Sequence, residues 1–221
     1  MSTSTWLVWQ LVDSAFPAGG FAHSFGLEAA WQQGEVTAAS LPAFVHDAVG
    51  QAARSSLPFV VAAHHDRADV AAVDERYEAF LRNAVANRAS RVQGRAWLAT
   101  VERSFPGPSM RSLCEGIRSQ AGPKHFAPVF GATLRALGIE REEAARLFLF
   151  GVARGTLSAA VRLGIAGTMD AQRMLFECSE HLDGAIRRCG DLAVDDAAQT
   201  SPLIDLWQAA HDRLYSRLFQ S

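Results

Sequence analysis

The pentapeptide Ala-His-Ser-Phe-Gly at residues 22–26 invites comparison with the nucleophile elbow of serine hydrolases, Gly-x-Ser-x-Gly. That elbow works because a β-strand turns sharply into a helix and exposes the serine hydroxyl, with an acid and a histidine later in the chain. Here no strand-like alternation precedes Ser24, whereas the turn residues Pro17 and Gly19 do. We therefore interpret Ser24 as the N-cap of a helix that begins at Phe25, and we predict no catalytic residue.

Histidine and cysteine side chains could hold a metal ion, but their spacing is poor. His64 and His65 are adjacent, so on a helix they point about 100° apart. Cys178, His181 and Glu177 place two or three ligands on one helical turn, and neither a His-Glu-x-x-His motif nor a pair of Glu-x-x-His elements is present. We predict no metal site and no cofactor. The alternative is an all-α enzyme with a metal or small-ligand site in its helical core, built from these histidines and Cys178.

Charge and cysteine content exclude several classes of function. Of the 21 basic residues only Lys124 is a lysine, and it lies in Gly-Pro-Lys-His, so the chain has no P-loop. A net charge of −2 argues against a nucleic-acid partner. Three cysteines without a Cys-x-x-Cys motif suit a reducing cytoplasm. We see no positively charged leader and no apolar run near the ~18 residues of a spanning helix, and so expect no membrane association.

Arginines gather in the middle of the chain, where seven lie between residues 82 and 118 against two acids, Glu102 and Glu115. Arg88, Arg91 and Arg95 are spaced three and four residues apart, so they share one face of a predicted helix. One interpretation is a solvated helix face. The other is a docking face for carboxylates of a protein partner, because a guanidinium binds a carboxylate through two parallel hydrogen bonds.

The end of the chain has a wide amphipathic pattern. Two neighbouring rows at a spacing of four are mostly apolar or aromatic: Leu203, Trp207, His211, Tyr215 and Phe219, and beside them Leu206, Ala210, Leu214 and Leu218. This pattern predicts a helix whose apolar face either packs on the chain's own core or docks in a groove of a partner. The candidate partner-binding residues are Arg88, Arg91, Arg95, Leu203, Trp207, His211, Tyr215, Arg217, Leu218 and Phe219.

Apolar residues elsewhere recur with the helical period, which predicts an all-α protein. Ser40 and Ser56 each precede Leu-Pro and are expected to cap helices. A run over 69–105 is too long to stay unbroken, and further helices are expected over 109–120, 126–137, 140–163 and 168–188. We predict a single compact multi-helix domain over 1–190, a linker over 191–202, and a C-terminal helical arm over 203–221 that docks on a partner.

Four segments, taken together, resemble the UreF family of urease accessory proteins. Residues 6–33 resemble its opening, whose motif is matched residue by residue by Pro17, Gly19, Ser24, Gly26, Leu27 and Glu28. Residues 90–95 are similar to its central Ser-x-x-x-Gly segment, residues 124–131 to its His-x-x-Pro/Val-x-x-Gly stretch, and residues 201–219 to its C-terminus. The four occur in the family's order and cover nearly the whole chain. Residues 153–163 depart from many bacterial members and look nearer to the plant branch.

The resemblance implies an all-α, non-enzymatic chaperone. Members of this family form homodimers, bind the accessory protein UreD (also called UreH) and recruit the GTPase UreG, and the assembly delivers nickel to the urease apoprotein. A C-terminal tail is associated with UreD binding, which would give the last amphipathic helix its partner. A chain without a P-loop would leave GTP hydrolysis to UreG.

Overall fold

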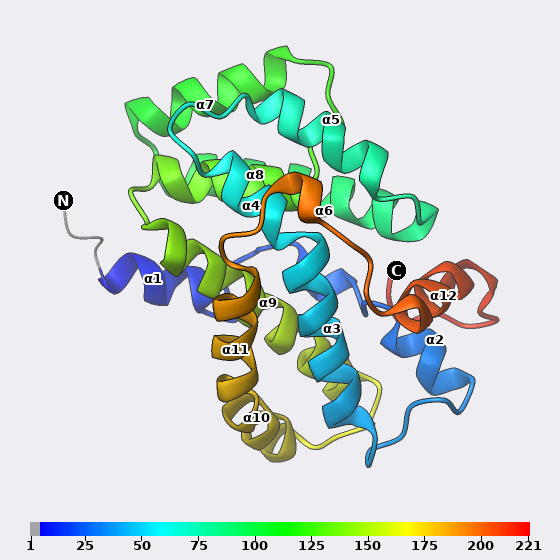
Figure 1. Cartoon of the computed structure of the whole chain (residues 1–221). Helices are drawn as coiled ribbons and strands as arrows, with labels where there is room; N and C mark the ends of the chain where they lie inside the picture. Colours follow the sequence, from blue (N-terminus) through cyan, green and yellow to red (C-terminus); the bar gives the residue numbers. More distant parts are fainter. Residues whose placement is uncertain (1–4) are drawn as a thin grey trace.

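The computed structural model describes residues 5–221, and in that range it has twelve α-helices and no β-strand (Figure 1). The helices are α1 (Thr5–Val12), α2 (Leu27–Gln32), α3 (Leu41–Ser55), α4 (Leu57–Ala63), α5 (Val70–Phe80), α6 (Ala84–Ser104), α7 (Pro108–Ser119), α8 (Phe126–Ala136), α9 (Arg141–Arg162), α10 (Thr168–Glu177), α11 (Ser179–Cys189) and α12 (Pro202–Ala210). Short 3-10 helices are η1 (Gly20–Ala22), η2 (Val194–Asp196) and η3 (His211–Arg213). The predicted all-α class and single compact domain are confirmed; residues 1–4 of the predicted 1–190 unit lie outside the described range.

Most helix ends follow local signals. The expected break in 69–105 is confirmed, because α5 ends at Phe80 and α6 begins at Ala84. Asn83 caps α6 by accepting two backbone N–H groups through its side-chain oxygen. The single helix expected over 168–188 is wrong in one respect, since it divides at Cys178 into α10 and α11.

The two Leu-Pro starts are placed correctly, and Ser40 and Ser56 occupy the predicted N-cap positions, but their side chains make no capping hydrogen bond. α3 and α4 begin at the leucines of both Ser-Leu-Pro sequences, with proline in the first turn. Ser40 instead accepts the amide of Thr37, and the Ser56 hydroxyl is hydrogen-bonded to the Tyr77 hydroxyl at 2.8 Å. The hydroxyl of Ser40 therefore bonds the loop before α3, and that of Ser56 bonds α5; neither bonds a free amide in the first turn of its own helix.

The core is built around α9, which packs against α3, α4, α8, α10 and α11 (Figure 1). α8 packs in turn against α4 and α6. Where α6, α8 and α9 meet, an aromatic cluster fills the interior: Phe16, Trp97, Phe126, Phe130 and Phe148. The buried indole of Trp97 donates to Thr133 of α8 at 2.8 Å, so its one polar atom is satisfied.

α9 is long and apolar enough to cross a membrane, and it is the one helix in residues 5–221 that passes this test. The expectation that no apolar stretch reaches spanning length is corrected here. Over the most apolar window 56% of the helix is buried inside the fold. A helix that is apolar on all sides is also what a protein core requires, so length and composition alone are weak evidence for a membrane span.

The chain beyond α11 differs most from the sequence prediction. The expected helix over 203–221 is wrong, since α12 ends at Ala210 and residues 214–221 are not helical. The amides of Leu218 and Phe219 donate to the carboxylate of Glu28, so they do not bond carbonyls one turn back. In Figure 1 this red end of the chain folds back beside α2.

The predicted linker, residues 191–202, is fastened to α3. The side-chain oxygen of Gln51 accepts the amides of Thr200 and Ser201 at 2.8 and 2.6 Å. Its amide nitrogen donates to Gln199 at 2.6 Å and to Asp205 at 3.3 Å. One largely buried glutamine therefore fixes where α12 begins.

Candidate functional site

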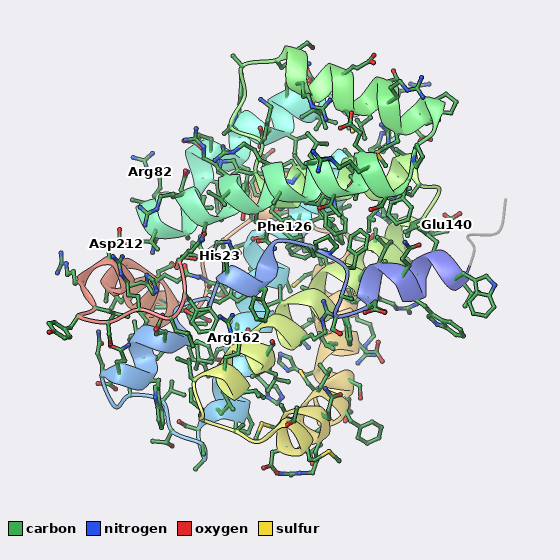
Figure 2. The ribbon with its side chains drawn as sticks, turned by 180° about the vertical axis from the view of Figure 1, so that it is seen from behind. His23, Arg82, Phe126, Glu140, Arg162 and Asp212 are labelled. Atoms are coloured by element: carbon green, nitrogen blue, oxygen red, sulfur yellow. The ribbon has the colours of Figure 1, made fainter. Side chains whose placement is uncertain are left out.

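Two parts of the chain that are distant in sequence meet at one end of the fold. The C-terminal segment, defined as residues 202–221, lies against the N-terminal motif, residues 17–28, and against α2 and α6 (Figure 1). In the described chain, the hydrogen bonds that join residues 216–221 to residues outside this segment all end on residues 22–32. In Figure 2, His23, Arg162 and Asp212 mark the region where the C-terminal segment, the N-terminal motif and α9 meet.

Glu28 is the centre of this contact. Its side chain is only 1% exposed, and its carboxylate accepts the amide of Leu218 at 2.6 Å and that of Phe219 at 3.2 Å. The same carboxylate lies 3.1 Å from Nε2 of His211, which must donate because the carboxylate only accepts. A buried carboxylate is tolerated only when such donors surround it, so Glu28 and the C-terminal segment depend on each other.

The predicted partner-binding residues of the C-terminal segment divide into buried and exposed sets. His211 and Phe219 are buried, and Trp207 packs against Phe44 of α3 with ring centroids 5.8 Å apart. Arg217 lies 3.4 Å from Asp212 within the segment. Four apolar side chains are exposed, which we call the docking residues: Leu203, Leu206, Tyr215 and Leu218. One part of the amphipathic pattern therefore packs into the core, and the other part is exposed.

The N-terminal motif binds the end of the chain. The amide and hydroxyl of Ser24 both donate to the carbonyl oxygen of Ser221, at 2.6 and 3.0 Å. The expectation that Ser24 caps a helix at Phe25 is wrong, because α2 begins at Leu27 and its N-cap is Gly26. Ser24 is fully buried, so its polar groups need the partner that Ser221 supplies.

His23 also faces Ser221, with Nδ1 2.6 Å from the serine hydroxyl. Its Nε2 atom is buried and has no hydrogen-bond partner in the described chain. Burial, reinforced by the nearby His211, lowers the pKa of His23 to about 4. The imidazole is therefore neutral at physiological pH.

Glycines in the motif permit close approach. Gly26 has a φ of +88°, and a methyl group there would lie 3.1 Å from the amide nitrogen of Gln208 in α12. Gly19, with a φ of +75°, faces Ala96 of α6 in the same way, at 3.3 Å. Pro17 accepts the hydroxyl of Thr100 on α6 through its carbonyl at 3.0 Å. The motif thus packs on α6 at its start and on the C-terminal segment at its end.

Arg162 makes contacts in this region that the sequence did not predict. Its guanidinium lies over the rings of Phe21 and Phe219, 3.8 and 4.2 Å from their centroids, and it donates to the carbonyl of Phe21. Cation–π contacts of this kind join the last turn of α9 to both ends of the site. No sequence signal marks the residue, because its partners lie about 140 and 57 positions away along the chain.

The arginine face on α6 is only partly available. Arg88 pairs with Asp212 of η3 at 2.8 Å, and Arg91 lies 3.9 Å from Glu78 of α5. Arg95 is exposed and has no ion-pair partner within residues 5–221. The docking role of all three stays a prediction, and Arg95 is the one of the three without an ion-pair partner in the described chain.

A second buried polar cluster holds the loop before α8. Asp74 of α5 accepts the amides of Lys124 and His125 at 2.6 and 2.8 Å, and Glu78 lies 2.6 Å from Nε2 of His125. Burial raises the pKa of Asp74, while the two amide hydrogen bonds oppose this effect. Burial lowers the pKa of His125, although Glu78 and Asp74 oppose it. These acids are committed to backbone and imidazole partners, so their role is structural.

The residues considered for a metal site are not brought together. Nε2 of His64 lies 2.8 Å from the Ile139 carbonyl, and His181 is stacked on His46 with ring centroids 4.4 Å apart. Cys178 is buried, and burial raises the pKa of its thiol. Among residues 5–221 no group of three His, Cys, Asp or Glu side chains is arranged to hold a metal ion.

A cavity of about 590 Å³ lies beside the N-terminal motif and the C-terminal segment. Its lining is mostly apolar and includes Phe21, Trp97 and Gly155, with polar groups from His23, Gln51 and Ser221. The C-terminal segment supplies part of its wall through Ile204, Gln208 and Ser221. The C-terminal segment therefore helps to enclose the cavity.

Comparison with known proteins agrees with the family resemblance of the sequence. The UreF family model matches residues 36–179, more than half of the chain. Urease accessory protein F of Oryza sativa subsp. indica is 36% identical over 98% of this chain and 85% of its own length. The Arabidopsis thaliana protein of the same name is 36% identical over 100% of this chain and 94% of its own, and the UreF of Arthrobacter sp. (strain FB24) is 30% identical over 96% and 95%. The chain therefore belongs to the UreF family of urease accessory proteins.

Proposed function

We propose that this chain is a non-enzymatic scaffold of urease maturation. It binds UreD (UreH), recruits the GTPase UreG, and so supports nickel insertion into the urease apoprotein, acting as a homodimer in the cytoplasm. Its relatives are named urease accessory proteins, which are not enzymes. The three cysteines are free, in keeping with a reducing compartment.

The observation that carries the proposal is the exposure of the docking residues on a segment fixed to the family motif. Leu203, Leu206 and Leu218 are 58%, 64% and 53% exposed, and Tyr215 is fully exposed. Apolar side chains on a rigid support are the anchors that protein interfaces use, because little conformational entropy is lost when they bind. A free Arg95 on the adjoining α6 adds a carboxylate-binding group to the same proposal.

The test is substitution of docking residues, Leu206→Asp and Leu218→Asp, in the full-length chain. We expect affinity for UreD to fall at least about tenfold, since a desolvated charge replaces an apolar anchor. Isothermal titration or co-purification measures the loss, and circular dichroism checks the fold. Whole-segment deletion is a poorer test because it removes the buried residues Ile204, His211 and Phe219.

The matched control is Phe176→Asp on α10, which changes an apolar side chain that is 79% exposed and lies outside the C-terminal segment. We expect this variant to bind UreD like the parent chain. If the two leucine variants also bind normally, the docking surface is placed wrongly. If all three lose affinity equally, the effect belongs to surface charge in general and not to these residues.

A further inference from the structure

Glu28 has an unusual set of partners for a buried carboxylate. It lies on α2, yet its donors all come from the C-terminal segment: the amides of Leu218 and Phe219 and the imidazole of His211. Within the described chain no donor from α2 or from another helix replaces them. Hydrogen bonds to an ionised acceptor are about twice as strong as those between neutral groups, so this contact is strong when formed.

The C-terminal segment is just as dependent on Glu28. Residues 214–221 have no regular secondary structure, so their amides cannot be satisfied by a helix of their own. Ser24 and His23 hold Ser221 through buried hydrogen bonds. Between η3 and Ser221 the other contacts are weaker: Gln32 donates to the Ser216 carbonyl from an exposed position, and the Gln220 amide donates to the Ala22 carbonyl. Exposed hydrogen bonds exchange readily with water and contribute little. Glu28 thus supplies the buried hydrogen bonds that hold residues 211–219, and Ser24 and His23 supply those that hold Ser221.

We propose that Glu28 is the positioning residue of the docking surface. Its carboxylate, through His211 and two backbone amides, fixes residues 211–219 on the N-terminal motif. It thereby sets where Tyr215 and Leu218 stand. This explains why a glutamate one residue into α2 belongs to the motif although it is hidden from any partner. The consequence for UreD rests on the proposed function, whereas the consequence for the segment itself does not.

We call the contact of Glu28 with His211, Leu218 and Phe219 the clamp. Two substitutions in the full-length chain test it, one at Glu28 and one at Leu218. Glu28→Gln keeps the size of the side chain, but its NH₂ group faces donors that need an acceptor. Leu218→Pro leaves Glu28 intact and removes one of the amides it accepts. The control is Glu35→Gln, because Glu35 is exposed and lies in the loop after α2. Amide hydrogen exchange of residues 211–221 is the first measurement, and UreD affinity of the Glu28 variant is the second.

In Glu28→Gln and Leu218→Pro we expect exchange of the amides in residues 216–221 to rise at least about tenfold. Amides of α9 should keep their protection, which separates release of the segment from general destabilisation. UreD affinity should fall in Glu28→Gln by a factor similar to that in Leu218→Asp. Glu35→Gln should resemble the parent chain in both measurements.

Three results overturn the proposal or its foundation. Unchanged exchange in both clamp variants shows that Glu28 does not hold the segment. Faster exchange with full UreD affinity, while Leu218→Asp still loses binding, shows that the clamp exists but does not position the docking surface. Full affinity in every variant, including Leu218→Asp, refutes the proposed docking function and leaves the clamp standing on its exchange data alone.

Discussion

At the scale of residues, Gly94 shows how the absence of a Cβ atom lets α6 pack closely against the start of α8. A methyl group at this position on α6 would lie 2.7 Å from the carbonyl carbon of His125 and 2.8 Å from the amide nitrogen of Phe126, and would overlap the Lys124 carbonyl. One turn earlier, the Ser90 hydroxyl accepts the amide of Phe126 at 3.2 Å. The Ser-x-x-x-Gly spacing thus places a hydroxyl and a gap on one helix face, and the loop before α8 fits against both.

Gly94→Ala should therefore destabilise the fold by about 2–4 kcal/mol, because the backbone of the loop must move away. The matched control is Gly116→Ala in α7, where an added methyl group meets no atom within 4 Å. That control should stabilise by about 0.5–1 kcal/mol, the usual gain when alanine replaces glycine inside a helix. Urea unfolding measures both free energies. Equal shifts in the two variants would contradict the packing argument.

At the scale of elements, α5 acts as the support on which α8 begins. Asp74 and Glu78, four residues apart on α5, bind the amides and the imidazole that immediately precede α8. Lys124 in this loop has a φ of +64°, a conformation that an L-residue adopts only when its surroundings require it. The two amide hydrogen bonds to Asp74 supply that requirement.

We expect Asp74→Asn to destabilise the protein by about 1–3 kcal/mol, since an asparagine offers one acceptor oxygen where two backbone donors converge. Glu75→Gln, on the exposed face of the same helix, serves as the control and should change stability by less than about 0.5 kcal/mol. Thermal unfolding followed by circular dichroism distinguishes them. If Asp74→Asn and the control unfold at the same temperature, the loop is held by other contacts.

At the scale of the whole molecule, sequence reasoning succeeded where the deciding interactions are local. Helical periodicity and the Leu-Pro starts act within a few residues, so the all-α class and several helix bounds could be predicted. The C-terminal segment could not, because its conformation is decided by Glu28, 190 residues away from Leu218. The apolar residues spaced four apart over 203–219 do not form one helix face. Some of them, His211 and Phe219, are buried, and the docking residues are exposed.

Three histidines whose pKa is lowered in the fold give the whole molecule a pH dependence. His23, His125 and His181 are each held at a lowered pKa, in every case chiefly by burial. His23, at about 4, has the value farthest from the 6.5 of an exposed histidine. In the unfolded chain these side chains take up protons at higher pH than in the folded chain. The stability that the neutral imidazoles confer is therefore complete above about pH 6.5 and is lost as the pH falls through the folded-state pKa, which for His23 is about 4.

We expect the free energy of unfolding to decrease between about pH 6.5 and pH 4, with His23 contributing up to about 1.4 kcal/mol per pH unit. His23→Asn should weaken this dependence, because an uncharged amide has no proton to gain, while His65→Asn at an exposed position should leave it unchanged. Urea unfolding at about pH 7 and about pH 5 measures the two slopes. Since His23 contacts Ser221, acid should also loosen the C-terminal segment before the core unfolds, which amide exchange at residues 216–221 detects. Equal pH dependence in the parent chain and in His23→Asn would show that the buried imidazole is not the group that titrates.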